Sequence, residues 1–356
     1  TLVDRAMQAG ALGLSSGLYY APASFADTEE VIALAEVSAQ YGGIYDAHIR
    51  DESTYNVGLL AAVLETLEIG EQAGLPVNIS HIKCLGVDVW GMSTLLVDTI
   101  NAARARGVQV TADQYPYLAS GTSLSNALLP KWVFADMDDF TPKLSDPELQ
   151  PRIEAGMAEN LCRRGGPASL LLTYSDVPGI TGKTLAEVAN ARGEPAVTTA
   201  IDILKQGGSA VASFNMNQDD VHHFMQQPWV MTCSDGTNAH PRKYGTFPKK
   251  IREFVREKQV LSLGQMIRQS TQLTAETFGI PERGSLREGY FADVLIFKPE
   301  EVIDHATFRE PAELSSGFTY IVLNGKVVVD GGAVKVRDGG RVVRRASASG
   351  PPPGGR

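Results

Sequence analysis

The chain has 356 residues, of which 43% are hydrophobic and 21% charged, and this composition supports a large buried core rather than a fibrous or disordered protein. Its formal net charge of −9 argues against a phosphate-backbone partner, because nucleic-acid binders usually present a basic face. We therefore expect a small-molecule substrate and no nucleic-acid partner.

Apolar runs and cysteines bear on the setting in which the chain works. No apolar run reaches the roughly 18–20 residues that a membrane-spanning helix needs, so we expect no membrane partner. The three cysteines are widely spaced and form neither a disulfide framework nor a CxxC metal motif, which favours a reducing, cytoplasmic compartment. The sequence leaves the oligomeric state open.

Strand and helix patterns alternate through the first third of the chain. They repeat about every 32 residues, which is typical of successive βαβ units with parallel strands. The opening TLVDRAMQAG is a helix pattern that a glycine ends, so we expect the chain to begin inside a domain. The predicted strands cover 10–20, 43–50, 75–83 and 108–117, and the helices between them cover 28–41, 53–73 and 92–106.

The pattern is less regular after residue 125. The segment 125–228 contains helix patterns near 145–165, 184–193 and 218–227, and two apolar strand patterns, SLLLTYS and AVASFNM, whose sheet the periodicity does not identify. PWVMTCSDG is a further strand pattern, and residues 262–280 are helical. The Asn324-Gly325 pair then predicts a β-hairpin.

These patterns divide the chain into three parts. Residues 1–280 are the predicted α/β portion, with an insertion near 125–228. Residues 281–338 are a small β portion, and 339–356 are a polar Ser/Pro/Gly tail that we expect to be disordered.

Polar residues gather at the carboxyl ends of four predicted strands, where the site of a parallel α/β fold lies. A single histidine in such a place is more often a packing residue, but the repetition over four strands indicates a site. The residues are His48, His81 with Lys83, Asp113 with Tyr115, and Asp235.

These residue types suit metal-assisted hydrolysis. Neutral imidazole nitrogens, as His48 and His81 offer, and a carboxylate oxygen are ligands that zinc accepts, with a position left for water. Such a metal lowers the pKa of water, and Asp235 can take and return the proton. Lys83 and Arg242 add two cations, which predict a substrate that bears a carboxylate.

The sequence resembles the amidohydrolase superfamily and, within it, the N-acyl-D-amino-acid deacylases, or D-aminoacylases. The resemblance covers nearly all of residues 1–335. It rests on GALGLSSGLYYAP, YDAHIRDES, NISHIKCLG, ADQYPYLASGT, SDGTNAHPRKYGTFPKK and GSLREGYFADVLIF.

The resemblance implies a fold, a cofactor and roles for single residues. The fold would be a partial (β/α)8 barrel, about strands four to eight, with a small β-sandwich portion, and the segment 125–228 would be a lid. The cofactor would be one or two zinc ions, held by His48, His81 and Asp235, with Asp235 also catalytic. Lys83, Tyr115 and Arg242 would bind the α-carboxylate of the substrate.

Two departures from the family pattern shape the expectations. Nothing in the chain matches the His-x-His pair of the first strand or the bridging ligand of the second, so roughly 170 residues and some zinc ligands would lie upstream. Gly121 stands where relatives often have Ser. Zinc-dependent hydrolysis of N-acyl-D-amino acids is the expected function; the alternatives are a cyclic-amide or dipeptide-like amidohydrolase, or a catalytically incomplete fragment.

Overall fold

The main sheet has five parallel strands. The computed structural model describes residues 1–135 and 139–345. Neighbouring strands pair in the order β1-β2-β3-β4-β8, and every pairing is parallel. The predicted α/β class is therefore confirmed. The strands are β1 (Gly13–Gly17), β2 (Ile44–His48), β3 (Val77–Ile79), β4 (Val110–Gln114) and β8 (Val230–Thr232).

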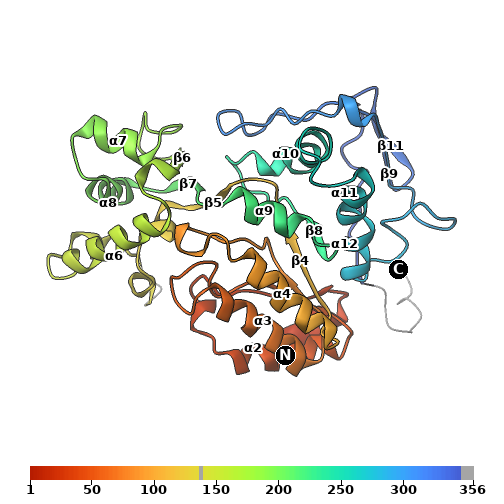
Figure 1. Ribbon diagram of the computed structural model, residues 1–356, viewed down its shortest axis with the longest axis horizontal. Coiled ribbons are helices and arrows are strands. Elements are labelled where there is room, and N and C mark those ends of the chain that lie inside the picture. Colours follow the sequence, from red (N-terminus) through yellow and green to blue (C-terminus); the bar gives the residue numbers. More distant parts are fainter. Residues whose placement is uncertain (136–138, 346–356) are drawn as a thin grey trace.

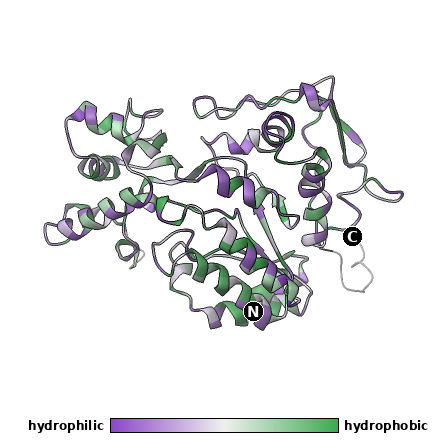
Figure 2. Cartoon of the chain, viewed as in Figure 1, coloured by the Kyte–Doolittle hydropathy of each residue, from purple (hydrophilic) through white to green (hydrophobic). Residues whose placement is uncertain are grey.

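Helices follow the first strands and cover the sheet, as Figure 1 shows. Helices α2, α3 and α4 carry both hydrophobic and hydrophilic residues (Figure 2), and their buried residues recur at three- to four-residue spacing, which suits helices with one side on a sheet. Their apolar side chains share one core with the strands. The elements are α1 (Leu2–Gln8), η1 (Ala23–Phe25), α2 (Thr28–Ala39), α3 (Leu59–Ala73), η2 (Val87–Val89) and α4 (Ser93–Ala105).

The predicted helix 53–73 begins six residues late, and Asp51 explains the difference. Its carboxylate accepts hydrogen bonds from the backbone N–H groups of Ser53, Asn56 and Gly58. Those bonds fold the chain into a loop, and Gly58 has a φ of 86° that a helix excludes. The loop places Glu52 next to the end of β2.

The segment after β4 forms a second unit with its own core. Its strands pair antiparallel in the order β5-β7-β6, apart from the main sheet. The sequence patterns missed β5 and α8. Helix α9 (Gln218–Met225) returns the chain to α4. The unit contains β5 (Ala119–Ser123), α5 (Leu124–Leu128), η3 (Lys131–Phe134), η4 (Pro142–Ser145), α6 (Gln150–Arg163), η5 (Pro167–Ser169), β6 (Leu170–Ser175), α7 (Leu185–Arg192), α8 (Ala196–Gln206) and β7 (Ser209–Phe214).

The last part of the chain forms several helices and then a small sheet, on the side of the molecule away from α6, α7 and α8 (Figure 1). The predicted hairpin is present, with positive φ at Asn324 (49°) and Gly325 (79°). The sheet order is β12-β11-β10-β9, all antiparallel. The elements are α10 (Arg242–Lys249), the π-helix η6 (Lys250–Glu257), α11 (Leu263–Ser270), α12 (Gln272–Thr277), β9 (Val294–Phe297), η7 (Pro299–Glu301), β10 (Phe318–Leu323), β11 (Lys326–Asp330) and β12 (Ala333–Val334).

The segment that we predicted as a disordered tail lies partly within the described residues. The backbone carbonyl of Gly339 accepts from Asn324 Nδ2 at 2.8 Å, and the backbone N–H of Arg345 donates to the Gly10 carbonyl at 3.4 Å. Residues 346–356 lie outside the described part.

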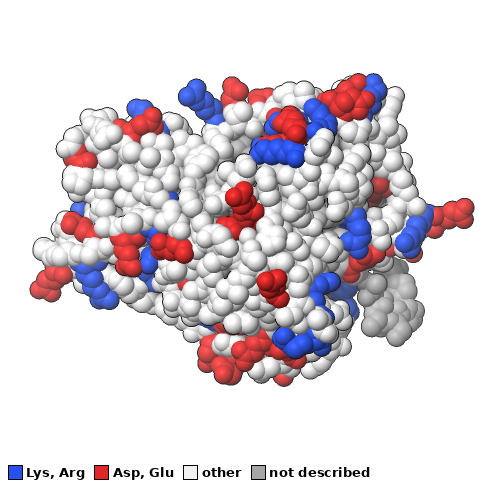
Figure 3. Space-filling model, in the orientation of Figure 1, with Lys and Arg blue, Asp and Glu red and all other residues white. Residues whose placement is uncertain are grey.

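Two surface properties of the described residues are plain: how charges are distributed on one face, and how apolar the helices are. Acidic and basic side chains are interspersed over the face seen in Figure 3. Within the described ranges, every helix is too short or too polar to cross a membrane.

Lys250 is buried beneath β8 without a carboxylate in ion-pair contact among the described residues. It is 1% exposed, and its Nζ donates to Thr232 Oγ1 at 2.8 Å and Gln269 Oε1 at 3.1 Å. Burial lowers the pKa of Lys250 from 10.5 to about 7, which nearby Cys233 opposes only in part.

The depressed pKa of Lys250 predicts a pH-dependent stability. Between pH 7 and 10.5 the unfolded chain holds more protons than the folded chain, so this group makes the protein more stable as pH rises. From pH 7.5 to 9.5, wild type should gain about 2 kcal/mol in free energy of unfolding relative to Lys250→Met. Urea unfolding of both proteins measures the difference, and the exposed Lys205→Met should track wild type. Parallel curves for wild type and Lys250→Met would contradict it.

Candidate functional site

All six predicted site residues line one cavity of about 190 Å³. It lies at the carboxyl ends of β2, β3, β4 and β8, where parallel strands of one sheet present their last residues. The structure therefore brings together segments that are far apart in sequence. The six are His48, His81, Lys83, Tyr115, Asp235 and Arg242.

His48 and His81 face each other inside this cavity. His48 Nδ1 lies 2.9 Å from His81 Nε2. Burial lowers the pKa of His48 to about 3, with the charges of His81 and Lys83 adding to the effect and Glu52 opposing it. The His48 ring is therefore neutral near pH 7, which is the form that binds metals.

Glu52 completes a group of three donors, and the sequence analysis missed it. Its Oε1 lies 3.1 Å from His81 Nδ1, and its Oε2 lies 4.0 Å from His48 Nε2. Ligand atoms of the three residues all lie within 4.8 Å of one another. Glu52 follows His48 by four residues, but it lies on the loop held by Asp51 rather than at a strand end, so strand-end reasoning passed over it.

Lys83 forms an ion pair with Glu52. Both side chains are buried, and Lys83 Nζ also lies 2.7 Å from His81 Nδ1. Although burial raises the pKa of Glu52, the charge of Lys83 and the hydrogen bond to His81 help to outweigh it, and that pKa lies well below the usual value. The Glu52 carboxylate is thus ionised and available as a ligand.

Asp235 and Arg242 form a second ion pair on the same cavity. Arg242 Nη1 lies 2.8 Å from Asp235 Oδ2; the arginine is 1% exposed, whereas the side chain of Asp235 is 32% exposed. Asp235 is not part of the three-donor group. The structure therefore places the predicted metal-binding carboxylate beside the predicted carboxylate-binding arginine.

Tyr115 lies under the Arg242 guanidinium, whose carbon is 4.6 Å from the ring centroid. Burial raises the pKa of Tyr115 well above its usual value, so the hydroxyl stays protonated. In the described part of the chain, Tyr115 OH and Arg242 Nε have no hydrogen-bond partner. Two buried donors without acceptors are what a bound anionic group would satisfy.

Two residues of the site have left-handed backbone conformations. His81 has a φ of 39° and Asp235 a φ of 41°, which are uncommon for residues other than glycine. The His81 N–H donates to Asp113 Oδ1 at 2.8 Å. Asp113, which the sequence placed among the polar strand-end residues, thus holds the backbone of His81 and does not line the cavity.

Gly121 lies against the Arg242 guanidinium. A Cβ there would come 3.2 Å from Arg242 Nη2 and 3.3 Å from the His240 ring. Glycine therefore leaves room for the arginine in its present position.

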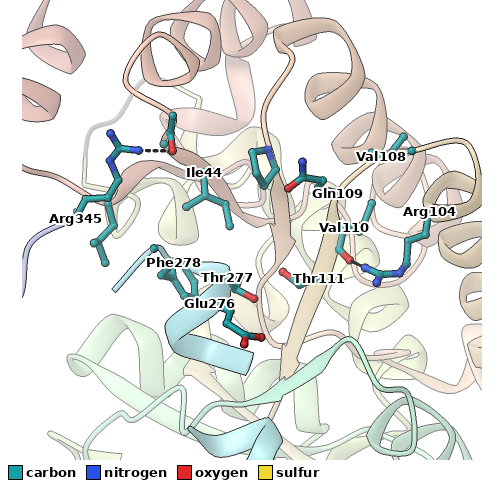
Figure 4. A pocket seen from close by; sticks show the side chains of 16 residues that line it. Ile44, Arg104, Val108, Gln109, Val110, Thr111, Glu276, Thr277, Phe278 and Arg345 are labelled. Atoms are coloured by element: carbon teal, nitrogen blue, oxygen red, sulfur yellow. Dashed lines mark hydrogen bonds between the residues drawn. The ribbon is translucent and has the colours of Figure 1, made fainter. Parts of the chain in front are cut away.

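A larger cavity of about 530 Å³ lies at the opposite ends of the strands, between β2, β4 and α12 (Figure 4). Its two arginines are occupied, because Arg104 donates to the Val110 carbonyl and Arg345 to the Gly42 carbonyl. It contains no group of three metal-ligating side chains among the described residues. The chemistry therefore points to the smaller cavity.

The family of the chain follows from its match along most of its length. The amidohydrolase family model matches residues 2–329. The chain belongs to the amidohydrolase family. The resemblance stated from the motifs is thus confirmed, and the partial barrel with a separate small sheet agrees with the solved structures that follow.

Curated amidohydrolases and solved structures resemble the chain over almost its full length. The D-aminoacylase and the N-acyl-D-glutamate deacylase of Alcaligenes xylosoxydans xylosoxydans are each 33% identical over 98% of this chain and 64% of their own. The chain thus spans somewhat less than two thirds of the relatives it matches.

Two solved structures resemble the chain over most of its length. N-acyl-D-glutamate deacylase from Bordetella bronchiseptica, complexed with zinc and a phosphonate mimic of the tetrahedral intermediate, has a TM-score of 0.76 at 33% identity and covers 92% of this chain and 61% of its own. A D-aminoacylase structure has a TM-score of 0.78 at 31% identity, covering 96% and 64%. A D-hydantoinase shares the fold alone, at 12% identity and a TM-score of 0.52.

Proposed function

We propose that the chain carries the metal-binding and carboxylate-binding part of an enzyme that hydrolyses the amide bond of N-acyl-D-amino acids. The observation that carries the proposal is one cavity that combines a His48–Glu52–His81 donor group with the Asp235–Arg242 pair. The similarity to deacylases of N-acyl-D-amino acids supports the substrate class.

The residues present fit a zinc ion. The buried Nε2 of His48 has no hydrogen-bond partner within the described ranges, and a metal would give it one. Two imidazoles and a carboxylate are a common zinc donor set. His48, His81 and Glu52 would hold the ion. Zinc bound there would supply Lewis-acid chemistry, which polarises a carbonyl oxygen and makes water more acidic.

Asp235 suits the proton transfer. Its carboxylate is partly exposed to the cavity and is held by its contact with Arg242, so it can accept a proton from the attacking water and return it to the leaving nitrogen. Its further role as a metal ligand, predicted from the sequence, remains a prediction.

Arg242, Tyr115 and Lys83 suit the α-carboxylate of the substrate. Among the described residues, the guanidinium of Arg242 and the hydroxyl of Tyr115 both have donor groups without a hydrogen-bond partner, and Lys83 adds positive charge on the same cavity. Binding there would fix the acyl amide relative to the donor group.

The first test measures metal content and turnover together. The purified chain should contain about one zinc per chain by elemental analysis and hydrolyse N-acetyl-D-methionine faster than the L-enantiomer or a dihydropyrimidine. His81→Ala should lose most of the zinc because it removes a ligand. His305→Ala, in the small β portion, is the matched control and should keep the metal.

Each other outcome points to an alternative. Faster hydrolysis of the dihydropyrimidine would favour a cyclic-amide substrate. No zinc and no turnover would mean that the matched part alone does not form a working site.

A further inference from the structure

Arg164 is a third cation of the cavity, and no sequence pattern singled it out. It is the C-cap of α6, in the inserted unit, yet it is 3% exposed and lines the same cavity as His48 and Arg242. The inserted unit therefore contributes a charged side chain to a site otherwise built by the main sheet.

Arg164 is the cation of the cavity that has no carboxylate partner among the described residues. Lys83 is paired with Glu52, and Arg242 with Asp235. Across the described residues, no ion pair joins Arg164 to a carboxylate, and the side chains that act on its guanidinium are the tyrosines Tyr19, Tyr20 and Tyr55. The cavity thus has three cations against two carboxylates.

The polar contacts of Arg164 are with neutral oxygens. Its Nε donates to the Ala127 carbonyl at 3.0 Å, and its Nη1 lies 3.2 Å from Asn215 Oδ1 when that amide is oriented to satisfy its neighbours. The Tyr55 ring lies 5.6 Å away. These contacts hold the guanidinium in place without neutralising it, although a buried charge is costly without a counter-ion.

We propose that Arg164 binds an acidic side chain of the substrate, so that N-acyl-D-amino acids with a second carboxylate are the preferred class. The inference rests on the proposed function and deepens it. Arg242 follows β8 and Arg164 comes from the inserted unit, and both line the same cavity, so one substrate with two carboxylates can contact both arginines. A planar guanidinium pairs with a carboxylate through two parallel hydrogen bonds.

The percentage identities to the relatives do not indicate which amino-acid side chain the substrate carries. The D-aminoacylase, the N-acyl-D-glutamate deacylase and the N-acyl-D-aspartate deacylase are each 33% identical to this chain. The unpaired arginine in the cavity is the feature that favours an acidic side chain.

The test compares N-acetyl-D-glutamate with N-acetyl-D-glutamine, which has the same shape and no side-chain charge. Binding to the full chain is measured by calorimetry, and turnover is measured separately. Wild type should prefer the acid on the order of 10- to 100-fold, the range expected for hydrogen bonds to a charged group. Arg164→Met should reduce the preference to within about threefold and leave the affinity for N-acetyl-D-glutamine nearly unchanged.

Arg163→Met is the matched control, because that neighbouring guanidinium bonds Thr54, Glu159 and Asn160 and does not line the cavity. It should keep the preference. Arg164→Lys keeps the charge without the planar fork and should retain a smaller preference, which covers the case in which Arg164→Met does not fold.

The outcomes separate this inference from the proposed function. No preference for the acid in wild type, or an unchanged preference in both Arg164 variants, overturns the role of Arg164. If wild type nevertheless hydrolyses the neutral substrate, the proposed function stands alone. Binding of the acid that depends on Arg164 without turnover supports Arg164 and counts against the hydrolase.

Discussion

Asp235→Asn should lower kcat/KM for N-acyl-D-amino acids about 100- to 10,000-fold while the protein stays folded. The asparagine has nearly the same shape but cannot carry the proton between water and the leaving nitrogen. Because Asp235 lies outside the donor group of His48, Glu52 and His81, the zinc content should remain close to that of wild type. Initial rates with N-acetyl-D-methionine, elemental analysis and a thermal melt measure the three quantities.

A control variant at a second aspartate tests whether the loss of turnover comes from the missing proton carrier or only from the loss of one negative charge. Asp219, in the first turn of α9, is exposed and does not line the cavity, so Asp219→Asn should leave kcat/KM within about twofold of wild type. Retained turnover in Asp235→Asn would remove Asp235 from the proposed mechanism. A large loss of zinc in that variant would instead support its predicted role as a ligand.

Much of the site could be predicted because parallel strands of one sheet end at the same edge. His48 and His81 end or follow adjacent strands, and Asp235 follows the strand beside β4, so their strand patterns alone place them together. The alternation of strand and helix patterns predicted the parallel sheet, and the Asn324-Gly325 turn predicted the hairpin.

The remaining site residues depend on contacts that no periodicity encodes. Glu52 reaches the histidines because Asp51 folds its loop through three backbone hydrogen bonds. Arg164 reaches the cavity from a helix end in a separate unit, about 120 residues along the chain from the first histidine. Asp113 has the residue type of a ligand but holds the backbone of His81. Side-chain type therefore predicts the chemistry better than it predicts which residue performs it.

Glu52→Gln should lower the free energy of unfolding by about 3–5 kcal/mol in metal-free buffer, because it leaves Lys83 buried without a counter-charge. Glutamine preserves the size of the side chain, so lost packing contributes little. Urea unfolding after EDTA treatment and dialysis measures the effect without interference from zinc binding.

The double variant Glu52→Gln/Lys83→Met decides whether the buried pair is the cause. Removing both charges should recover most of the lost stability, since replacing a buried ion pair by uncharged groups is often nearly neutral. The exposed pair of Glu71 and Arg106 is the control, and Glu71→Gln should cost less than about 1 kcal/mol. If the double variant is as unstable as Glu52→Gln, the carboxylate stabilises the fold through its contact with His81 rather than through Lys83. In that case, the Glu52–Lys83 ion pair would not be what stabilises the position of Glu52 in the donor group.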